Sequence, residues 1–291
     1  MTEGAAGRYT LWAIIGVIGG MLSFQFGAGI AKSLFSSVGP LGATALRQTL
    51  AAIFLMALFR PWRNWPPRSA WKWLIVFGLN LGLMNLCFYL SFQRIPLGIA
   101  VAIEFMGPLS VAVWSSRRPL DFVWVACAAT GLWFLLPHAG GGALDPIGVA
   151  LAVAAGVGWA SYILLGQKVA QRVPEGQAVS FGVAFSCLIT LPLALITIGA
   201  PLIQPQILLT GLMVALLSSA VPYTLEMFAL KRIPARTFSI LMSLEPALAA
   251  LSGLILLHEA LSPQQWLAIA LVVLASGGSA LTARRAQMAP Q

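Results

Sequence analysis

Charged residues are scarce in this chain of 291 residues. They make up 9% of the sequence, while 59% of the residues are hydrophobic, and a typical soluble domain has about 25% charged residues. So few charges cannot cover a soluble surface, and the composition therefore predicts an integral membrane protein. The 17 basic residues outnumber the 8 acidic ones, but they stand singly or in small groups between long apolar runs. This pattern reports orientation in a membrane and argues against a nucleic-acid partner.

Signatures of catalysis and metal binding are also missing. His258-Glu259 does not begin an HExxH motif, because Ala-Leu-Ser follows, and the sequence has neither a GxSxG elbow nor a Walker loop. Cys87, Cys127 and Cys187 each lie alone within an apolar run. We expect them to pack as small hydrophobic side chains and not to form disulfides or a metal site. The sequence thus predicts no enzyme, no cofactor, no metal and no ATP-driven step.

Apolar runs long enough to cross a bilayer recur along the whole chain. A spanning helix needs about 20 mostly apolar residues, and runs of this length are too long for the strands of a membrane barrel. The first run is longer than the apolar part of a signal peptide, so we expect it to be retained. The sequence predicts an all-α protein with ten transmembrane helices near residues 11–31, 41–59, 73–92, 97–116, 120–137, 147–167, 177–198, 207–229, 235–257 and 263–283.

Lysine and arginine are distributed unevenly between alternate loops of this arrangement. One side holds 14 of them, the other side holds only Lys32 and Arg94, and Arg47 lies inside the second run. Loops rich in lysine and arginine stay in the cytoplasm. The sequence therefore predicts that both the N-terminus and the C-terminus are cytoplasmic.

Two stretches 138 residues apart resemble each other. The stretches are QRIPLGIAVAIEFMGP at 93–108 and KRIPARTFSILMSLEP at 231–246. In each, Arg-Ile-Pro opens an apolar run and a proline ends the stretch. Each predicted half, 1–138 and 147–285, contains five spans, and because five is odd the second half enters the membrane inverted. Inverted repeats are typical of secondary transporters, which expose a central site alternately to either side.

Several stretches carry a further resemblance: LGATALRQTLA (41–51), RIPLGIAVAIEFMGPL (94–109), SSRRPLDFVW (115–124) and PYTLEMFALKRIPARTFSILMSLEPALAALSGLILLHE (222–259). The two halves resemble tandem EamA domains of the drug/metabolite transporter superfamily, and the chain is most similar to the bacterial amino-acid exporters among them. The resemblance covers nearly the whole chain. It implies a ten-helix exporter of amino acids and related metabolites in the bacterial inner membrane. One departure is His258, since members often have glycine before the glutamate that ends the ninth span.

Ionisable residues inside the predicted spans are candidates for function, because each costs about 2.5–3.5 kcal/mol in the bilayer unless it is paired or faces water. Glu104 and Arg47 are expected at matching depths, so they are predicted either to form a structural ion pair or to line a cavity together. Glu245 has no basic residue at its depth, which favours a site that takes up and releases a proton. Glu226 is expected to pair with Lys231 or Arg232.

An amino-acid substrate would need acceptors for its ammonium group and donors for its carboxylate group. Polar and aromatic residues at mid-membrane depth are candidates for this cavity, and the alternative role for each is packing between helices. Pro108 and Pro246 occupy equivalent places in the two halves and are predicted hinges. Besides Glu104 and Glu245, the candidate cavity residues are Gln25, Asn80, Asn85, Tyr89, Trp159, Tyr162, Tyr223 and Ser243.

The sequence and the resemblance together predict a secondary transporter that exports amino acids from the bacterial cytoplasm by alternating access. Its expected partners are a small-molecule substrate, the lipid bilayer and, as a hypothesis, protons as the coupling ion. An exporter of other small metabolites or drug-like cations in the same fold is an open alternative. A membrane-embedded enzyme is a more distant one, since no catalytic constellation is seen.

Overall fold

The computed structural model describes residues 3–114, 123, 124, 126, 127, 130, 131, 134, 144–233, 238, 241–258 and 262–287. In this part of the chain the regular structure is entirely helical. Six helical segments are long and apolar enough to cross a membrane. They are α1 (Glu3–Lys32), α2 (Phe35–Phe59), α3 (Arg68–Arg94), α7 (Pro146–Ala170), α8 (Glu175–Thr197) and a continuous unit made of α9 (Pro205–Ala215), the π-helical segment η3 (Leu216–Ala220) and α10 (Val221–Arg232).

Further helices, whose apolar stretches are shorter, complete the fold. These are α4 (Leu97–Glu104), α5 (Met106–Trp114), α12 (Glu245–Leu257) and α13 (Pro263–Gln287), with the 3-10 turns η1 (Pro61–Arg63), η2 (Ala200–Ile203) and η4 (Met242–Leu244). The prediction of an all-helical membrane protein is confirmed. Most of the predicted fifth run, 120–137, lies outside the described residues.

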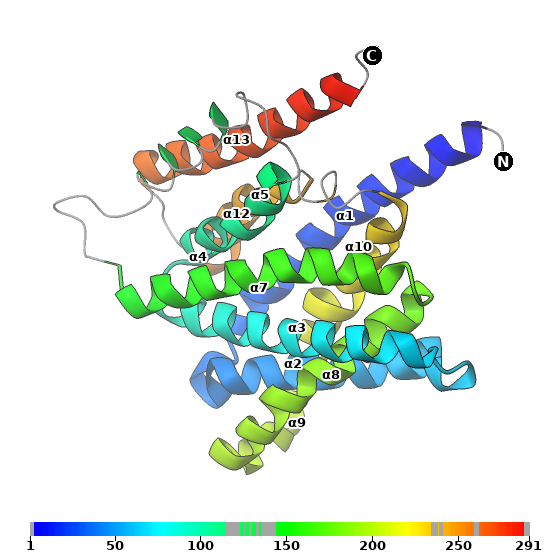
Figure 1. Cartoon of the computed structure of the whole chain (residues 1–291). Coiled ribbons are helices and arrows are strands. Elements are labelled where there is room, and N and C mark those ends of the chain that lie inside the picture. Colours follow the sequence, from blue (N-terminus) through cyan, green and yellow to red (C-terminus); the bar gives the residue numbers. More distant parts are fainter. Residues whose placement is uncertain are drawn as a thin grey trace.

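The helices pack side by side, with α3 lying along α7 through the middle of the molecule (Figure 1). The N-terminal end of α1 and the C-terminal end of α13 lie on the same side of the molecule (Figure 1). The second run was predicted at 41–59, but the helix that contains it, α2, begins earlier, at Phe35, because it continues across a kink. At this kink Gly39 has a φ of 63°, a conformation that glycine adopts without strain, and Pro40 follows.

The predicted fourth run, 97–116, is interrupted and is not one continuous helix. α4 ends at Glu104 and α5 begins at Met106, so Phe105 marks the break. Pro108 explains it, since a proline has no N–H group for the carbonyl four residues earlier, which is that of Glu104. The predicted hinge residue therefore lies one turn after a real interruption of the helix.

The predicted ninth run shows a similar interruption around Pro246. The 3-10 turn η4 ends at Leu244, and α12 begins at Glu245, so Pro246 stands in the first turn of α12. Pro246 has no N–H for the carbonyl of Met242, four residues earlier, and this carbonyl instead accepts from the N–H of Glu245 in the 3-10 turn. Both candidate carboxylates thus sit at a helix break, Glu104 as the last residue of α4 and Glu245 as the first residue of α12.

The apolar core is divided into two clusters, with a polar layer between them. Along α1, Met21 belongs to one cluster and Ala31 to the other, and Gln25 lies between them. Along α2, Leu46 and Ala51 belong to different clusters, and Arg47 lies between them. The same change of cluster occurs at Asn85 in α3, at Glu104 at the end of α4, and at Glu245 in α12. Buried polar groups therefore gather at one level, near the middle of the long helices.

A close approach between backbones holds the broken fourth run against α7. A Cβ atom on Gly107 would overlap the carbonyl oxygen of Gly156, and a Cβ on Gly156 would lie 2.7 Å from the carbonyl oxygen of Glu104. Only glycine allows this contact, because the atoms on the other side belong to a backbone that cannot rotate away.

Alanine at Gly107 is accordingly expected to destabilise the protein by about 1–3 kcal/mol, since α5 must move away from α7. Gly19→Ala is the matched control. It lies in α1, where the new Cβ would have no neighbour within 4 Å apart from the adjoining backbone of its own helix, and it is expected to be neutral or slightly stabilising. Thermal unfolding of both variants in detergent measures the difference, and equal melting temperatures would contradict the close-packing argument.

Candidate central cavity

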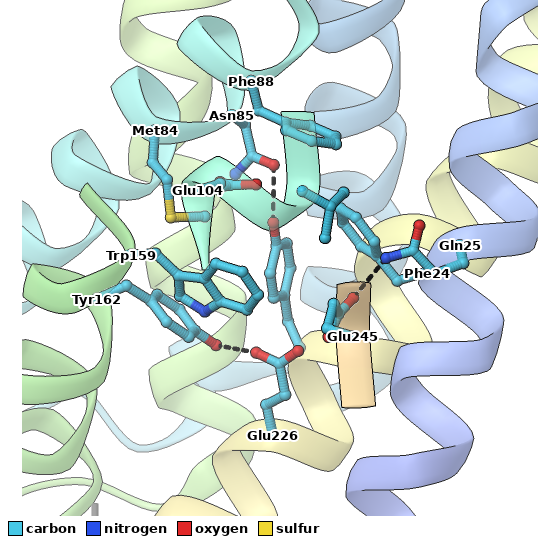
Figure 2. Close-up of a pocket in the computed structure, with 12 residues that line it drawn as sticks. Phe24, Gln25, Met84, Asn85, Phe88, Glu104, Trp159, Tyr162, Glu226 and Glu245 are labelled. Atoms are coloured by element: carbon cyan, nitrogen blue, oxygen red, sulfur yellow. Dashed lines mark hydrogen bonds between the residues drawn. The ribbon is translucent and has the colours of Figure 1, made fainter. Parts of the chain in front are cut away.

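The polar layer surrounds a cavity between α1, α3, α4, α7, α10 and α12 (Figure 2). Its volume of about 30 Å³ holds one or two water molecules, so side chains must move before a larger molecule can enter. Its walls combine aromatic side chains, two amides and three carboxylates. The lining residues are Phe24, Gln25, Met84, Asn85, Phe88, Val101, Glu104, Trp159, Tyr162, Tyr223, Glu226 and Glu245.

Two of the carboxylates accept hydrogen bonds from side chains of other helices. Gln25 Nε2 donates to Glu245 Oε1 over 2.8 Å, and Tyr162 Oη donates to Glu226 Oε2 over 2.7 Å (Figure 2). Glu104, Glu226 and Glu245 are all buried. Three acidic groups around one small cavity make it rich in acceptors, and a bound cation or ammonium group would balance their charge.

Asn85 is held in a fixed orientation. Its Oδ1 accepts hydrogen bonds from Tyr223 Oη, over 3.0 Å, and from Arg47 Nη2, while its Nδ2 donates to the carbonyl oxygen of Leu81 over 2.7 Å. The amide therefore has one N–H left to donate, and this group belongs to a residue that lines the cavity. Trp159 also lines it and contributes an indole N–H donor.

Arg47 is completely buried beside this cavity. Its Nη1 donates to the Ser218 carbonyl oxygen over 2.6 Å and to Ser219 Oγ over 2.9 Å, and the guanidinium lies 4.9 Å from the centre of the Tyr89 ring. Pro222, four residues later, has no N–H to donate to the carbonyl of Ser218, and the π-helical turn η3 shifts the neighbouring backbone bonds to a spacing of five residues. Arg47 thus replaces the hydrogen bond that a proline removes from the helix.

The predicted ion pair of Arg47 with Glu104 is not formed in the structure. Both residues lie in the described part of the chain, where Arg47 bonds Asn85, Ser218 and Ser219 and appears in none of the ion pairs. Matching depth was the basis of the prediction, but depth does not fix direction around a helix axis.

Seven of the ten candidate cavity residues line the cavity, and two others in the described part of the chain, Asn80 and Tyr89, do not. Tyr89 is buried against Arg47, and Asn80 Nδ2 donates to the Gly158 carbonyl oxygen over 2.9 Å, so Asn80 connects α3 with α7. The side chain of Ser243 lies outside the described residues. The candidate residues that line the cavity are Gln25, Asn85, Glu104, Trp159, Tyr162, Tyr223 and Glu245.

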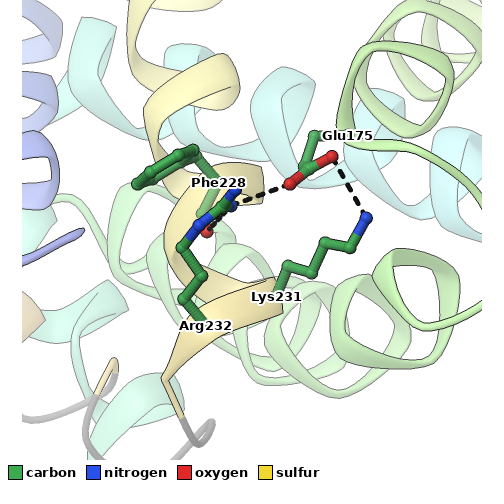
Figure 3. A network of polar contacts seen from close by, with 4 residues as sticks. All are labelled: Glu175, Phe228, Lys231 and Arg232. Atoms are coloured by element: carbon green, nitrogen blue, oxygen red, sulfur yellow. Dashed lines mark hydrogen bonds and ion pairs between the residues drawn. The ribbon is translucent and has the colours of Figure 1, made fainter. Parts of the chain in front are cut away.

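Glu226 was assigned the wrong partners, and its place in the cavity was missed. Lys231 and Arg232 instead bind Glu175 at the start of α8, over 3.2 Å and 2.7 Å (Figure 3). Glu226 precedes them by five and six residues, whereas side chains on one helix meet at spacings of three or four. That spacing was the signal in the sequence that could have directed Glu226 elsewhere.

A second exposed ion pair joins the end of α3 to the start of α7. Arg94 Nη1 lies 2.7 Å from Asp145 Oδ2, and Asp145 Oδ1 accepts from the N–H of Ile147 as the N-cap of α7. The hydrogen bond from Arg94, followed by the backbone N–H of Ile147, lowers the pKa of Asp145. Because the pair is exposed to solvent, it contributes little to the free energy of unfolding, and its main effect is to fix the start of α7.

Comparisons with known proteins agree on the kind of molecule. A model of the EamA-like transporter family matches residues 11–135 and 146–280. The chain is 48% identical to the threonine/homoserine exporter RhtA of Escherichia coli K12, over 97% of this chain and 96% of that protein. It is 49% identical to the exporter of the same name from Salmonella typhimurium LT2, with the same coverage. It is 28% identical to the uncharacterized transporter YwfM of Bacillus subtilis, over 70% of this chain and 72% of that one.

A crystal structure shares the fold. Its chain has a TM-score of 0.68 and 21% sequence identity, and the match covers 98% of this chain and 100% of that one. At this identity the likeness concerns the arrangement of the helices alone.

Proposed function

Because this chain belongs to the EamA-like transporter family, we propose that it exports threonine, homoserine and related amino acids through the central cavity. The substrate class rests on the exporters that are 48% and 49% identical to it along nearly their whole length. The cavity that gathers three carboxylates at the level of two helix breaks is the structural observation that carries the proposal.

The donors and acceptors of the cavity suit a zwitterion. In our proposal the ammonium group of the substrate binds among Glu104, Glu226 and Glu245, which offer more acceptor atoms than their present partners use. The carboxylate group binds the N–H donors of Trp159 and Asn85. Tyr162 and Tyr223 fix the orientation of these groups, since their hydroxyls already donate to Glu226 and Asn85.

Alternating access would use the internal duplication. We propose ten spans in two inverted halves, 1–138 and 147–285, and the two separate matches to the family model support this division. Pro108 and Pro246 would act as hinges, because each lies at an interrupted helix that carries a cavity carboxylate. The small volume of the cavity means that the halves must part before substrate enters.

We propose that the chain lies in the bacterial inner membrane with both termini in the cytoplasm. Support comes from the uneven distribution of lysine and arginine and from the position of the outer ends of α1 and α13 on one side of the molecule. A reporter that is active only in the periplasm, fused after Gln291, should be inactive, and one that is active only in the cytoplasm should be active. The reverse result would refute this orientation.

Counterflow in proteoliposomes tests the transport function. Vesicles loaded with unlabelled threonine should accumulate labelled threonine, and homoserine should compete with it, whereas vesicles without protein should not respond. A panel of the remaining amino acids then gives the specificity. No counterflow with any amino acid would overturn the proposal.

The excess of carboxylates over basic groups in the cavity favours cations as a second candidate class of substrate. Three carboxylates line the cavity, and the nearby guanidinium of Arg47 is occupied by Asn85, Ser218 and Ser219. Drug-like cations without a carboxylate group would then be transported. Counterflow of such a cation, in vesicles that show no counterflow of any amino acid, would favour this alternative over an amino-acid exporter.

A further inference from the structure

Three cations surround one tryptophan where α3 begins and α7 ends. The Nζ atoms of Lys72 and Lys168 lie 5.0 Å and 4.8 Å from the centre of the Trp73 ring, and the guanidinium carbon of Arg172 lies 5.3 Å from it. Arg172 Nη1 also donates to the carbonyl oxygen of Lys168 over 2.6 Å, so its side chain is folded back over the end of α7. Lys72, Lys168 and Arg172 are exposed.

No carboxylate balances these three charges within the described part of the chain. The ion pairs found there join Arg94 to Asp145, and Lys231 and Arg232 to Glu175. Cations held close together repel one another, and the cation–π contacts with Trp73 only partly offset this. An anion placed among them would be attracted by all three at once.

An apolar hollow lies beside the cluster, between α5 and α7. It has a volume of about 290 Å³ and is lined by Ser110, Val111, Trp114, Ala160 and Leu164. Lys168 follows Leu164 by one turn on the same face of α7. The hollow therefore begins one helical turn from the cationic cluster.

We propose that these two features form a binding site for one anionic phospholipid. The phosphate group binds among Lys72, Lys168 and Arg172, and an acyl chain lies in the hollow below Lys168. Basic pockets between transmembrane helices bind anionic head groups in this way, and tryptophan is favoured at this depth of a membrane. The proposal is independent of the substrate, since the site lies on the outer surface of the helices and not in the central cavity.

Native mass spectrometry of the detergent-solubilised protein tests this site. Phosphatidylglycerol should be retained more strongly than phosphatidylcholine, and the double variant Lys168→Gln/Arg172→Gln should bind phosphatidylglycerol about tenfold or more weakly. Lys231→Gln/Arg232→Gln is the matched control, because it removes the same charge from a cluster that already has a carboxylate partner. It should keep the affinity of the unmodified protein, and melting temperatures verify that both variants are folded.

Three results would overturn the proposal. Equal retention of the two lipids would exclude recognition of an anionic head group. Equal losses in the two double variants would show that only the overall charge matters. Displacement of the lipid by inorganic phosphate at similar concentration would identify a phosphate site that makes no use of the hollow.

Discussion

Alanine at Arg47 should lower the free energy of unfolding by about 2–4 kcal/mol, because three buried acceptors lose this donor at once. These are the Ser218 carbonyl oxygen, Ser219 Oγ and Asn85 Oδ1. Asn85 keeps Tyr223 as a donor, but the carbonyl of Ser218 has no substitute, since Pro222 cannot supply an N–H. Thermal or denaturant unfolding in detergent measures the loss.

Pro222→Ala should partly rescue Arg47→Ala. The new N–H at position 222 can donate to the Ser218 carbonyl oxygen, as in an ordinary helix, so the double variant should be about 1 kcal/mol more stable than the sum of the single effects. Pro192→Ala is the matched control, because Pro192 also lies inside a helix, α8, and is not four residues after Ser218. This account of Arg47 would be refuted if the effects of Pro222→Ala and Arg47→Ala on stability were additive. It would also be refuted if Pro192→Ala rescued Arg47→Ala equally well.

Much of the cavity could be predicted from single residues. A polar residue inside an apolar run must find a partner or a cavity, so Gln25, Asn85, Glu104 and Glu245 could be identified before their neighbours were known. Hydropathy alone gave the long helices for the same reason, since a bilayer requires continuous apolar helices. These predictions depend on each segment by itself.

Partners across helices could not be predicted in the same way. Depth along a helix follows from residue number, but rotation and tilt depend on packing against neighbours. Arg47 was therefore assigned to Glu104, although its acceptors are an amide, a hydroxyl and a carbonyl freed by Pro222. The position of that carbonyl was readable, because it lies four residues before the proline, but nothing in the sequence said which side chain would reach it.

The broken fourth and ninth runs were also only partly predictable. Prolines at 108 and 246 indicated weak points, yet a proline inside an apolar run can bend a helix without ending it. In the structure the breaks fall where α4 meets α7 and where η4 meets α12. Gly107 and Gly156 explain the first, since their contact holds α5 against α7 at the point where the hydrogen-bond ladder is already open.

Glu245→Gln should abolish transport driven by a pH gradient and leave exchange of substrate measurable. Three carboxylates around one cavity need compensating positive charge, and Arg47 is already bound to Asn85, Ser218 and Ser219. A proton and the substrate ammonium can supply it in turn, which would couple their movements in opposite directions. We propose Glu245 for this role because it begins α12 at the break before Pro246, where movement of the helix would change its exposure.

Glutamine at this position keeps the shape of the side chain and can still accept the hydrogen bond from Gln25, but it cannot bind a proton. For one proton exchanged per substrate, a gradient of one pH unit supplies about 1.4 kcal/mol, enough for about a tenfold accumulation. Proteoliposomes with and without the gradient should show this accumulation for the unmodified protein and for Glu175→Gln, whose carboxylate lies outside the cavity and binds Lys231 and Arg232. Glu245→Gln should equilibrate its substrate in both conditions. If the unmodified protein ignores the gradient, proton coupling is refuted, and Glu245 acts instead as an acceptor for the substrate ammonium or as a structural partner of Gln25.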